Sequence, residues 1–456
     1  MSYLLIAFYV ATPYLVAAAA GLSIAILAVR SYASFRAGMI LMVCAFCLDI
    51  VALSRPILHI GLTLYTADLP MALLFAIAAA RWIVRPDVPR RDPAWLSFAL
   101  LFLVDFGLGL VIHGTAAGAQ ARTDFHAIAA GVYALSFPVG RKEIRQTIGA
   151  LVGAAVVLML LCVYRWTVYY GNFRDLLPLA GSFNIDGPTR VIGSPGALMI
   201  GQLVVVGLFF VSLGRGALWA RLLLLPMTAS VLVLQHRSVW LALLVGLGAS
   251  LILVRSHKAS RVRQLLMLGA LVGAGVIGLA ASSALRGQIE TSAVRAIQGQ
   301  DTVSARFSNW KATLTQWREA GPRAIVMGRE AGADTTRTVV DSSGRDVRIS
   351  FGAHNYYIIV LTTMGVVGVA LFAWMGAQSL ARLYRQSRAD DDDAPYASLL
   401  LVLLMMQATY YVAYATDLMQ FLIFGIASAF AFRRHAEPAE ATTAPQARRF
   451  QGPVVL

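Results

Sequence analysis

Charged side chains are scarce in this 456-residue sequence. Only 13% of the residues are Asp, Glu, Lys or Arg, against roughly 25% in an average soluble domain. Hydrophobic residues make up 58%, and the mean hydropathy is +0.70. So little polar surface cannot cover a water-soluble globule of this size. The sequence therefore predicts a protein whose main solvent is the lipid bilayer.

Cysteines are few as well. Cys44, Cys47 and Cys162 all lie inside apolar runs, which excludes a disulfide framework and a Cys/His metal set. Neither an HExxH nor a Walker pattern occurs in the chain. We therefore expect no metal ion and no cofactor.

Acidic residues are outnumbered by basic ones, 23 against 38, which gives a formal net charge of +15. Such an excess in a soluble protein would favour a nucleic-acid partner. Here the basic residues fall mostly in short connectors between apolar runs, so we predict no nucleic-acid partner. One set of alternate connectors, including the tail, holds 21 Lys and Arg and the other only 6. Because cytoplasmic connectors are rich in Lys and Arg, the first set, and with it the C-terminus, is predicted to be cytoplasmic.

Thirteen apolar runs are candidates to cross about 30 Å of hydrocarbon. The last two are separated by Thr416 and Asp417 alone, so twelve or thirteen crossings are consistent with the sequence. The predicted fold is an all-α polytopic membrane protein, a bundle of about 12–13 transmembrane helices. The runs are Leu4–Val29, Ala37–Leu53, Thr66–Val84, Trp95–Ile112, Phe125–Val139, Thr147–Tyr164, Pro195–Leu213, Ala217–Leu234, Ser238–Val254, Gln264–Ala281, Asn355–Ala381, Tyr396–Ala415 and Leu418–Phe432.

One long hydrophilic segment interrupts these runs on the predicted outer side. Within it, Ser304–Ala320 carries Trp310 and Trp317 seven residues apart and is predicted to be an amphipathic helix. The predicted organisation is transmembrane helices with short loops over 1–281, a large helical periplasmic loop over 282–353, C-terminal transmembrane helices over 354–435 and a disordered cytoplasmic tail over 436–456.

Three acidic residues, Asp49, Asp68 and Asp105, lie within or at the ends of apolar runs. A carboxylate that faced lipid would be costly, so we expect these side chains to face the bundle interior. Two interpretations are open, a proton relay or hydrogen bonds between helices. Asp68, close to Pro70 and to the predicted outer boundary, favours the structural one.

His354 stands where the long outer segment ends and an apolar helix is predicted to begin. A histidine at this boundary is often just an interfacial polar residue, but imidazole is also the side chain best matched to proton transfer near neutral pH. His354-Asn355 is followed after nine residues by Gly365-Val366-Val367-Gly368, which gives H-N-x9-G-x-x-G. The two glycines are also explained by close packing of membrane helices.

This pattern resembles the signature of bacterial O-antigen ligases, within the superfamily of O-antigen ligases and polymerases. The resemblance implies a metal-independent, inverting glycosyltransferase of the bacterial inner membrane. It would act at the periplasmic face, transferring O-antigen polysaccharide from undecaprenyl pyrophosphate to the lipid A–core oligosaccharide. The expected partners are therefore the undecaprenyl-pyrophosphate-linked glycan, the lipid A–core acceptor and membrane lipids. His354 would be the catalytic base.

Arg190 and Arg237 lie in outer turns next to apolar runs. We predict that they bind the pyrophosphate, because a guanidinium binds phosphate oxygens in a bidentate manner. The alternative is that each arginine only reaches lipid headgroups. His236 departs from the family, which usually has a small hydroxyl residue at that position.

Arg306 and Asn355 are further candidates for substrate binding, although Arg306 is equally well explained as a solvated residue of the loop helix. A polysaccharide polymerase that uses the same lipid-linked donor is the alternative within the superfamily. A polysaccharide-related membrane transporter is the alternative from another class, but it leaves the outer arginines and His354 unexplained.

Overall fold

The computed structural model describes residue 23 and residues 25–51, 58–59, 63–85, 92–170, 190–213, 218–253, 269, 303–340, 345–350 and 352–433. Most of the predicted run Leu4–Val29, nearly all of Gln264–Ala281 and the tail 436–456 lie outside these residues. The domain boundary at 281/282 also lies outside them, so the domain organisation stays a prediction.

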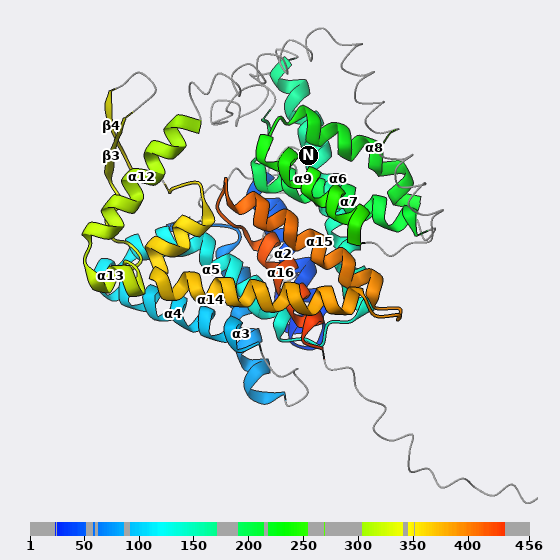
Figure 1. The fold of residues 1–456 in the computed structure, drawn as a ribbon. Coiled ribbons are helices and arrows are strands. Elements are labelled where there is room, and N and C mark those ends of the chain that lie inside the picture. The colour runs from blue at the N-terminus through cyan, green and yellow to red at the C-terminus, as the bar shows by residue number, and fades with distance from the viewer. Residues whose placement is uncertain are drawn as a thin grey trace, which may run out of the picture.

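The described chain is an all-α bundle, as predicted (Figure 1). Five helices are long and apolar enough to cross a membrane, which confirms a multi-pass membrane protein. They are α4 (Pro93–His113), α6 (Arg141–Tyr170), α7 (Ser194–Ser212), α14 (Tyr356–Ser387) and α15 (Ala394–Tyr411). The bundle is completed by α5 (Thr115–Leu135), which is long but less apolar, and by the shorter helices α2 (Phe35–Val51), α3 (Asp68–Val84), α8 (Leu218–Val233), α9 (Arg237–Leu253) and α16 (Leu418–Ala431).

Helix α16 lies at the centre of the bundle, and every one of its residues is buried. It packs closely on α5, where a Cβ added to Gly425 would lie 2.5 Å from the Gly131 carbonyl oxygen. Small residues at such a crossing let helices approach closely without a loss of packing. Large apolar side chains of α4 such as Leu100, Val104 and Val111 are exposed instead, as expected of a lipid-facing surface.

Helix α5 begins ten residues before the predicted run Phe125–Val139. The added stretch, Thr115-Ala-Ala-Gly-Ala-Gln-Ala-Arg, is rich in alanine, the residue with the highest helix propensity. It is too polar to be read as membrane-spanning. The helix therefore extends beyond the run that hydropathy predicts to cross the membrane.

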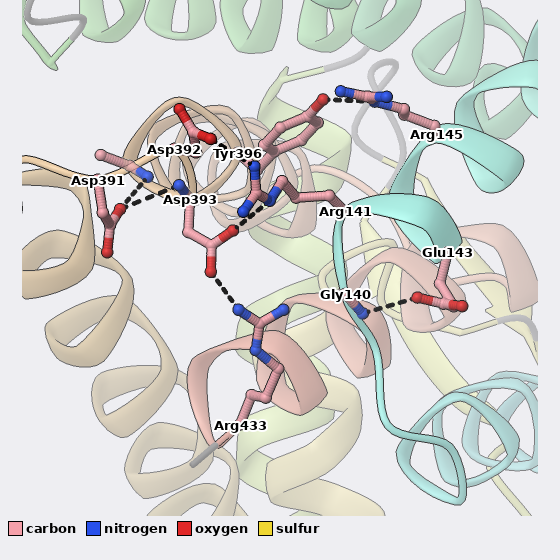
Figure 2. Close-up of polar contacts among 10 residues, drawn as sticks. Gly140, Arg141, Glu143, Arg145, Asp391, Asp392, Asp393, Tyr396 and Arg433 are labelled. Carbon is pink, nitrogen blue, oxygen red and sulfur yellow. Dashed lines mark hydrogen bonds and ion pairs between the residues drawn. The ribbon is translucent and has the colours of Figure 1, made fainter. Parts of the chain in front are cut away.

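One end of the bundle is held by ion pairs among connectors predicted to be cytoplasmic (Figure 2). Arg141, at the start of α6, lies 2.8 Å from the Asp393 carboxylate and 2.9 Å from that of Asp392. Arg433, just after α16, also contacts Asp393. The acidic run before α15 thus joins three helix ends.

The long hydrophilic segment lies at the opposite end (Figure 1). It contains α12 (Val303–Glu319), which confirms the predicted amphipathic helix, and the short α13 (Pro322–Met327). It also contains an antiparallel hairpin, β3 (Arg337–Val340) with β4 (Asp346–Ile349). The hairpin was not predicted, although Thr338, Val339 and Val340 have the β-branched side chains that favour strands. A second, very short pair, β1 (Leu58–His59) and β2 (Thr63–Leu64), connects α2 to α3.

Candidate active site

His354 is held in an unusual backbone conformation at this outer end. Its φ is +48°, a region that side chains other than glycine enter at a cost of order 1–3 kcal/mol. The preceding residues are fixed by α12, because Trp310 Nε1 donates a 2.6 Å hydrogen bond to the Ala353 carbonyl and Asn309 donates to that of Gly352. The His354 side chain remains exposed. The loop helix therefore holds in place the turn that presents this imidazole.

Asn355 forms the N-cap of α14. Its side-chain oxygen accepts a hydrogen bond from the Ile358 amide at 3.2 Å, and only 7% of the residue is exposed. Asn is among the residues preferred at this position because it satisfies an amide that the helix cannot. The structure thus gives Asn355 a capping contact that fixes the start of α14 directly after His354.

Tyr414 brings Arg306 and His354 together. Its ring lies 6.3 Å from the His354 ring in an edge-to-face arrangement, and the Arg306 guanidinium carbon lies 5.2 Å from its centroid. Cation–π contacts of this kind are worth about 0.5–2 kcal/mol. Tyr414 stacks in turn on Tyr410 at 5.1 Å. Arg306, which the sequence left ambiguous, is therefore a neighbour of the candidate base.

The connector that carries Tyr414 ends at Asp417, the N-cap of α16. The Asp417 carboxylate accepts a 2.9 Å hydrogen bond from the Gln420 amide. Burial raises the pKa of this carboxyl to about 6, although the hydrogen bonds from Gln420 and Met419 oppose the shift. The connector is thus anchored to the start of α16 by a buried carboxyl group whose pKa is raised.

The segments that carry Arg190 and Arg237 contact each other directly. His236 Nε2 lies 3.0 Å from the Ile192 carbonyl oxygen, and both arginines are half-buried. His236, which departs from the family pattern, therefore links the two turns. The residue before it, Gln235, has a φ of +53°. Among the described residues other than glycine, positive φ occurs only at Gln235 and His354. Gln235 lies two residues before the predicted pyrophosphate ligand Arg237, and His354 is itself the predicted base.

These two turns are also linked to the His354 side of the site. Ser194, at the start of α7, lies 2.8 Å from the Tyr410 hydroxyl through its own hydroxyl oxygen, and Tyr410 stacks on Tyr414. The N-cap of α7 is Gly193, which offers no side-chain cap to the backbone amides of the first turn, and Arg190 precedes it by three residues. Amides and a guanidinium at a helix N-terminus suit an anionic ligand.

The first glycine of the G-x-x-G pair, Gly365, allows a close approach of another backbone segment to α14. Gly365 has a φ of +66° and kinks α14. A Cβ there would lie 2.3 Å from the Val326 carbonyl oxygen, and one on Gly328 would lie 2.1 Å from that of Thr363. The Arg329 amide donates to the Thr362 carbonyl at 3.0 Å. The kink is thus where the α13 segment docks against α14, backbone to backbone.

Asp68 has the structural role that its position favoured. Its carboxylate lies 3.1 Å from Arg122 Nε and 2.9 Å from His126 Nε2, both on α5, and it accepts a hydrogen bond from the Tyr65 amide. The group thereby fastens the start of α3 to α5. Asp105, by contrast, lines a small cavity with Asp124.

Sequence reasoning missed a cavity of about 260 Å³ beside the candidate base. Its wall includes Gly352, Ala353 and Ala415, the immediate neighbours of His354 and Tyr414, together with Asp124 of α5 and Arg337 of β3. Asp124 is a single carboxylate at the edge of an apolar run, with no motif around it. Tyr414 is one of 16 tyrosines. Only the fold brings these residues to the site.

Comparison with known proteins agrees with the resemblance in the sequence. Residues 222–373 match the family model described as O-antigen ligase. This part of the chain is similar to an O-antigen ligase domain. This domain includes Arg237, Arg306, His354 and Asn355, whereas Arg190 lies before it. No curated protein matches the chain. The O-antigen ligase match thus supports a glycan-processing membrane enzyme.

Proposed function

We propose that this protein is an O-antigen ligase that transfers a preassembled polysaccharide from undecaprenyl pyrophosphate to the lipid A–core oligosaccharide. One observation carries the proposal. The turns that bear Arg190 and Arg237 are joined through His236 and Ile192, and they connect to Arg306 and His354 through Ser194, Tyr410 and Tyr414. Phosphate-binding cations and a base thereby share one end of the bundle.

The chemistry follows from the activated donor. The acceptor hydroxyl oxygen attacks the anomeric carbon and forms the new glycosidic bond, while the bond from that carbon to the pyrophosphate oxygen breaks. The electron pair leaves on the pyrophosphate, whose negative charge Arg190 and Arg237 stabilise. The hydroxyl proton passes to His354. Direct displacement of this kind inverts the configuration at the anomeric carbon.

The compartment is part of the same proposal. The bacterial inner membrane is the expected location, with the His354 end facing the periplasm. The excess of Lys and Arg in the opposite connectors supports this orientation. Several of those connectors meet in the cluster of Arg141, Asp393 and Arg433, at the end of the bundle away from His354.

A deletion strain tests the proposal against the polymerase alternative. Loss of a ligase should leave lipid-linked polymer accumulating while lipopolysaccharide lacks O-antigen. Loss of a polymerase should instead leave cores capped with a single repeat. Complementation with the wild-type gene should restore the full ladder. A strain in which single repeats cap the core would reject the ligase assignment and favour the polymerase.

A further inference from the structure

The cavity beside His354 offers hydrogen-bond acceptors that the protein itself leaves unused. Asp124 lines both this cavity and the smaller one next to it, and no residue that the structure describes forms a hydrogen bond or ion pair with its carboxylate. Glu330, in the segment after α13, also lines this cavity. Its carboxylate likewise has no hydrogen-bond or ion-pair partner among the residues that the structure describes. A carboxylate accepts hydrogen bonds through two oxygens and donates none. These groups therefore call for a ligand that donates.

The positive charges of the cavity are already engaged. Arg337 donates to Asn309 and, at 2.8 Å, to the Thr335 carbonyl, and Arg329 donates to the Asp334 carbonyl at 2.8 Å. The two guanidinium groups therefore hydrogen-bond to the walls of the cavity, and their charge is offset by the two carboxylates. A phosphate offers mainly hydrogen-bond acceptors, and the unengaged groups of the cavity, Asp124 and Glu330, are acceptors themselves. A neutral ligand rich in hydroxyl groups is the chemistry that fits.

Size and aromatic surface narrow the class of ligand. A volume of about 260 Å³ is far above the roughly 10–15 Å³ that a single water molecule needs, and it suits one ring rather than a chain of them. Trp317 contributes aromatic surface to the wall while its indole N–H is occupied by the Ala324 carbonyl. A pyranose presents both hydroxyl groups and apolar C–H faces, and so matches this combination.

We propose that this cavity is a binding subsite for one neutral pyranose ring, with the Asp124 carboxylate as its principal hydrogen-bond acceptor. The inference rests on the proposed function for the source of the sugar. A ring seated here lies against Gly352, Ala353 and Ala415, next to the His354 and Tyr414 side of the site. It belongs either to the core acceptor or to the first sugar of the lipid-linked glycan.

A binding measurement tests the subsite without relying on transfer. Purified full-length protein in detergent is titrated with the methyl glycosides of glucose, galactose, mannose and N-acetylglucosamine, with saturation-transfer NMR as the readout. At least one glycoside should bind, and inorganic phosphate should not displace it. Asp124→Asn should weaken its binding about 10- to 100-fold, the size expected for hydrogen bonds to a charged group.

Two further variants keep this test decisive. Ala333→Trp fills the cavity from the loop and should abolish glycoside binding without touching Asp124. Asp346→Asn makes the same carboxylate-to-amide change at an exposed position on β4 and should leave binding unchanged. The subsite is rejected if no glycoside binds the wild type, if both cavity variants bind like the wild type, or if phosphate displaces the sugar.

Transfer kinetics then identify the source of the ring. With lipid-linked glycan and core oligosaccharide as substrates, Asp124→Asn should raise the KM for the acceptor if the acceptor sugar occupies the cavity, and the KM for the donor if the donor sugar does. An unchanged KM for both would overturn the subsite. If the wild type transfers nothing, the proposed function fails, while the NMR titration still decides whether the cavity binds sugar.

Discussion

Backbone strain marks the residues on which the proposed chemistry depends. Gln235 and His354 adopt positive φ in the two turns that carry Arg237 and the candidate base. Such conformations persist only where the surrounding contacts determine them. The contacts of Trp310 and Asn309 with the turn before His354, and of His236 with Ile192, supply that constraint. The strain therefore reflects groups held in place before substrate binds.

Replacing either outer arginine should remove the stabilisation of the leaving pyrophosphate. We expect Arg190→Ala and Arg237→Ala to lose nearly all transfer. Arg237→Lys should keep only part of it, because an ammonium group cannot form the paired hydrogen bonds by which a planar guanidinium binds two phosphate oxygens. The measurement is the lipopolysaccharide ladder of a complemented deletion strain, with expression checked. Arg345→Ala, on the exposed start of the β4 strand segment, is a matched control. A full ladder in both alanine variants would contradict the pyrophosphate assignment.

The ring of Tyr414 should matter more than its hydroxyl group. Tyr414→Phe keeps the face beneath Arg306 and the contact with His354, so it should retain most of the transfer rate. Tyr414→Leu removes a cation–π contact worth about 0.5–2 kcal/mol and should lower kcat about 3- to 30-fold. Steady-state kinetics separate this effect from changes in KM. Tyr384→Leu, near the other end of α14, should leave the rate unchanged. Equal rates for the Leu and Phe variants at Tyr414 would show that the ring does not position these groups.

The candidate residues differ in how far the sequence could identify them. His354 and the arginines stand out as polar residues beside apolar runs, and a motif supports His354. Tyr414 could not be identified, because aromatic residues are common in such a chain and only the fold brings this ring close to both Arg306 and His354. Asn355 could be identified as important but not for its cap, which depends on where α14 begins.

At the scale of elements, hydropathy predicted the apolar helices better than the more polar segments of the chain. Apart from α5, the described helices from α2 to α9 and from α14 to α16 follow the predicted apolar runs. The early start of α5 and the hairpin of β3 and β4 did not follow, because alanine-rich and β-branched stretches outside lipid are set by local propensity and packing. The kink at Gly365 depends on a tertiary contact with the α13 segment.

The cap of α16 should make stability depend on pH. The pKa of Asp417, about 6 in the folded protein, lies above the value of about 3.9 for an unfolded chain. The folded state therefore holds the proton more tightly, and stability is lost as pH rises from about 4 through 6. Asp417→Asn keeps an acceptor for the Gln420 amide without the charge. It should be more stable than the wild type by about 1–3 kcal/mol at neutral pH.

Thermal unfolding of the detergent-purified proteins at pH 4.5 and pH 7.5 measures this effect. The advantage in Tm of Asp417→Asn over the wild type should be larger at pH 7.5. Asp346→Asn, an exposed carboxylate on the same side of the bundle, should show no such change between the two pH values. An advantage that is equal at both pH values would mean that Asp417 does not titrate in this range.

At the scale of the whole molecule, the bundle has two chemically different ends. The connectors rich in basic residues meet around Asp393, and the residues proposed for catalysis meet around Tyr414. The bias in Lys and Arg along the sequence predicts that the two ends lie on opposite sides of the membrane, and this orientation stays a prediction. The order of the helices around α16 could not be read from thirteen runs of similar composition.

Cysteine labelling tests the orientation of the two ends. In a background with alanine at the three native cysteines, Asp346→Cys on β4 should react with a membrane-impermeant maleimide in intact spheroplasts. Asp390→Cys, in the connector before α15, should react only after the membrane is permeabilised, since it is predicted to be cytoplasmic. The background alone should not react. Labelling of both positions from the same side would contradict the predicted orientation.

The central claim is that His354 takes the proton of the acceptor hydroxyl. It is tested most directly by comparing His354→Ala with the wild type in two measurements on the same purified protein, binding of the undecaprenyl-pyrophosphate donor and transfer to the core acceptor. Donor binding should persist, while transfer should fall about 10²–10⁴-fold, as expected for loss of a general base. The wild-type rate should rise with pH as imidazole loses its proton. Transfer by His354→Ala at the wild-type rate, or its failure only because the donor no longer binds, would contradict the account.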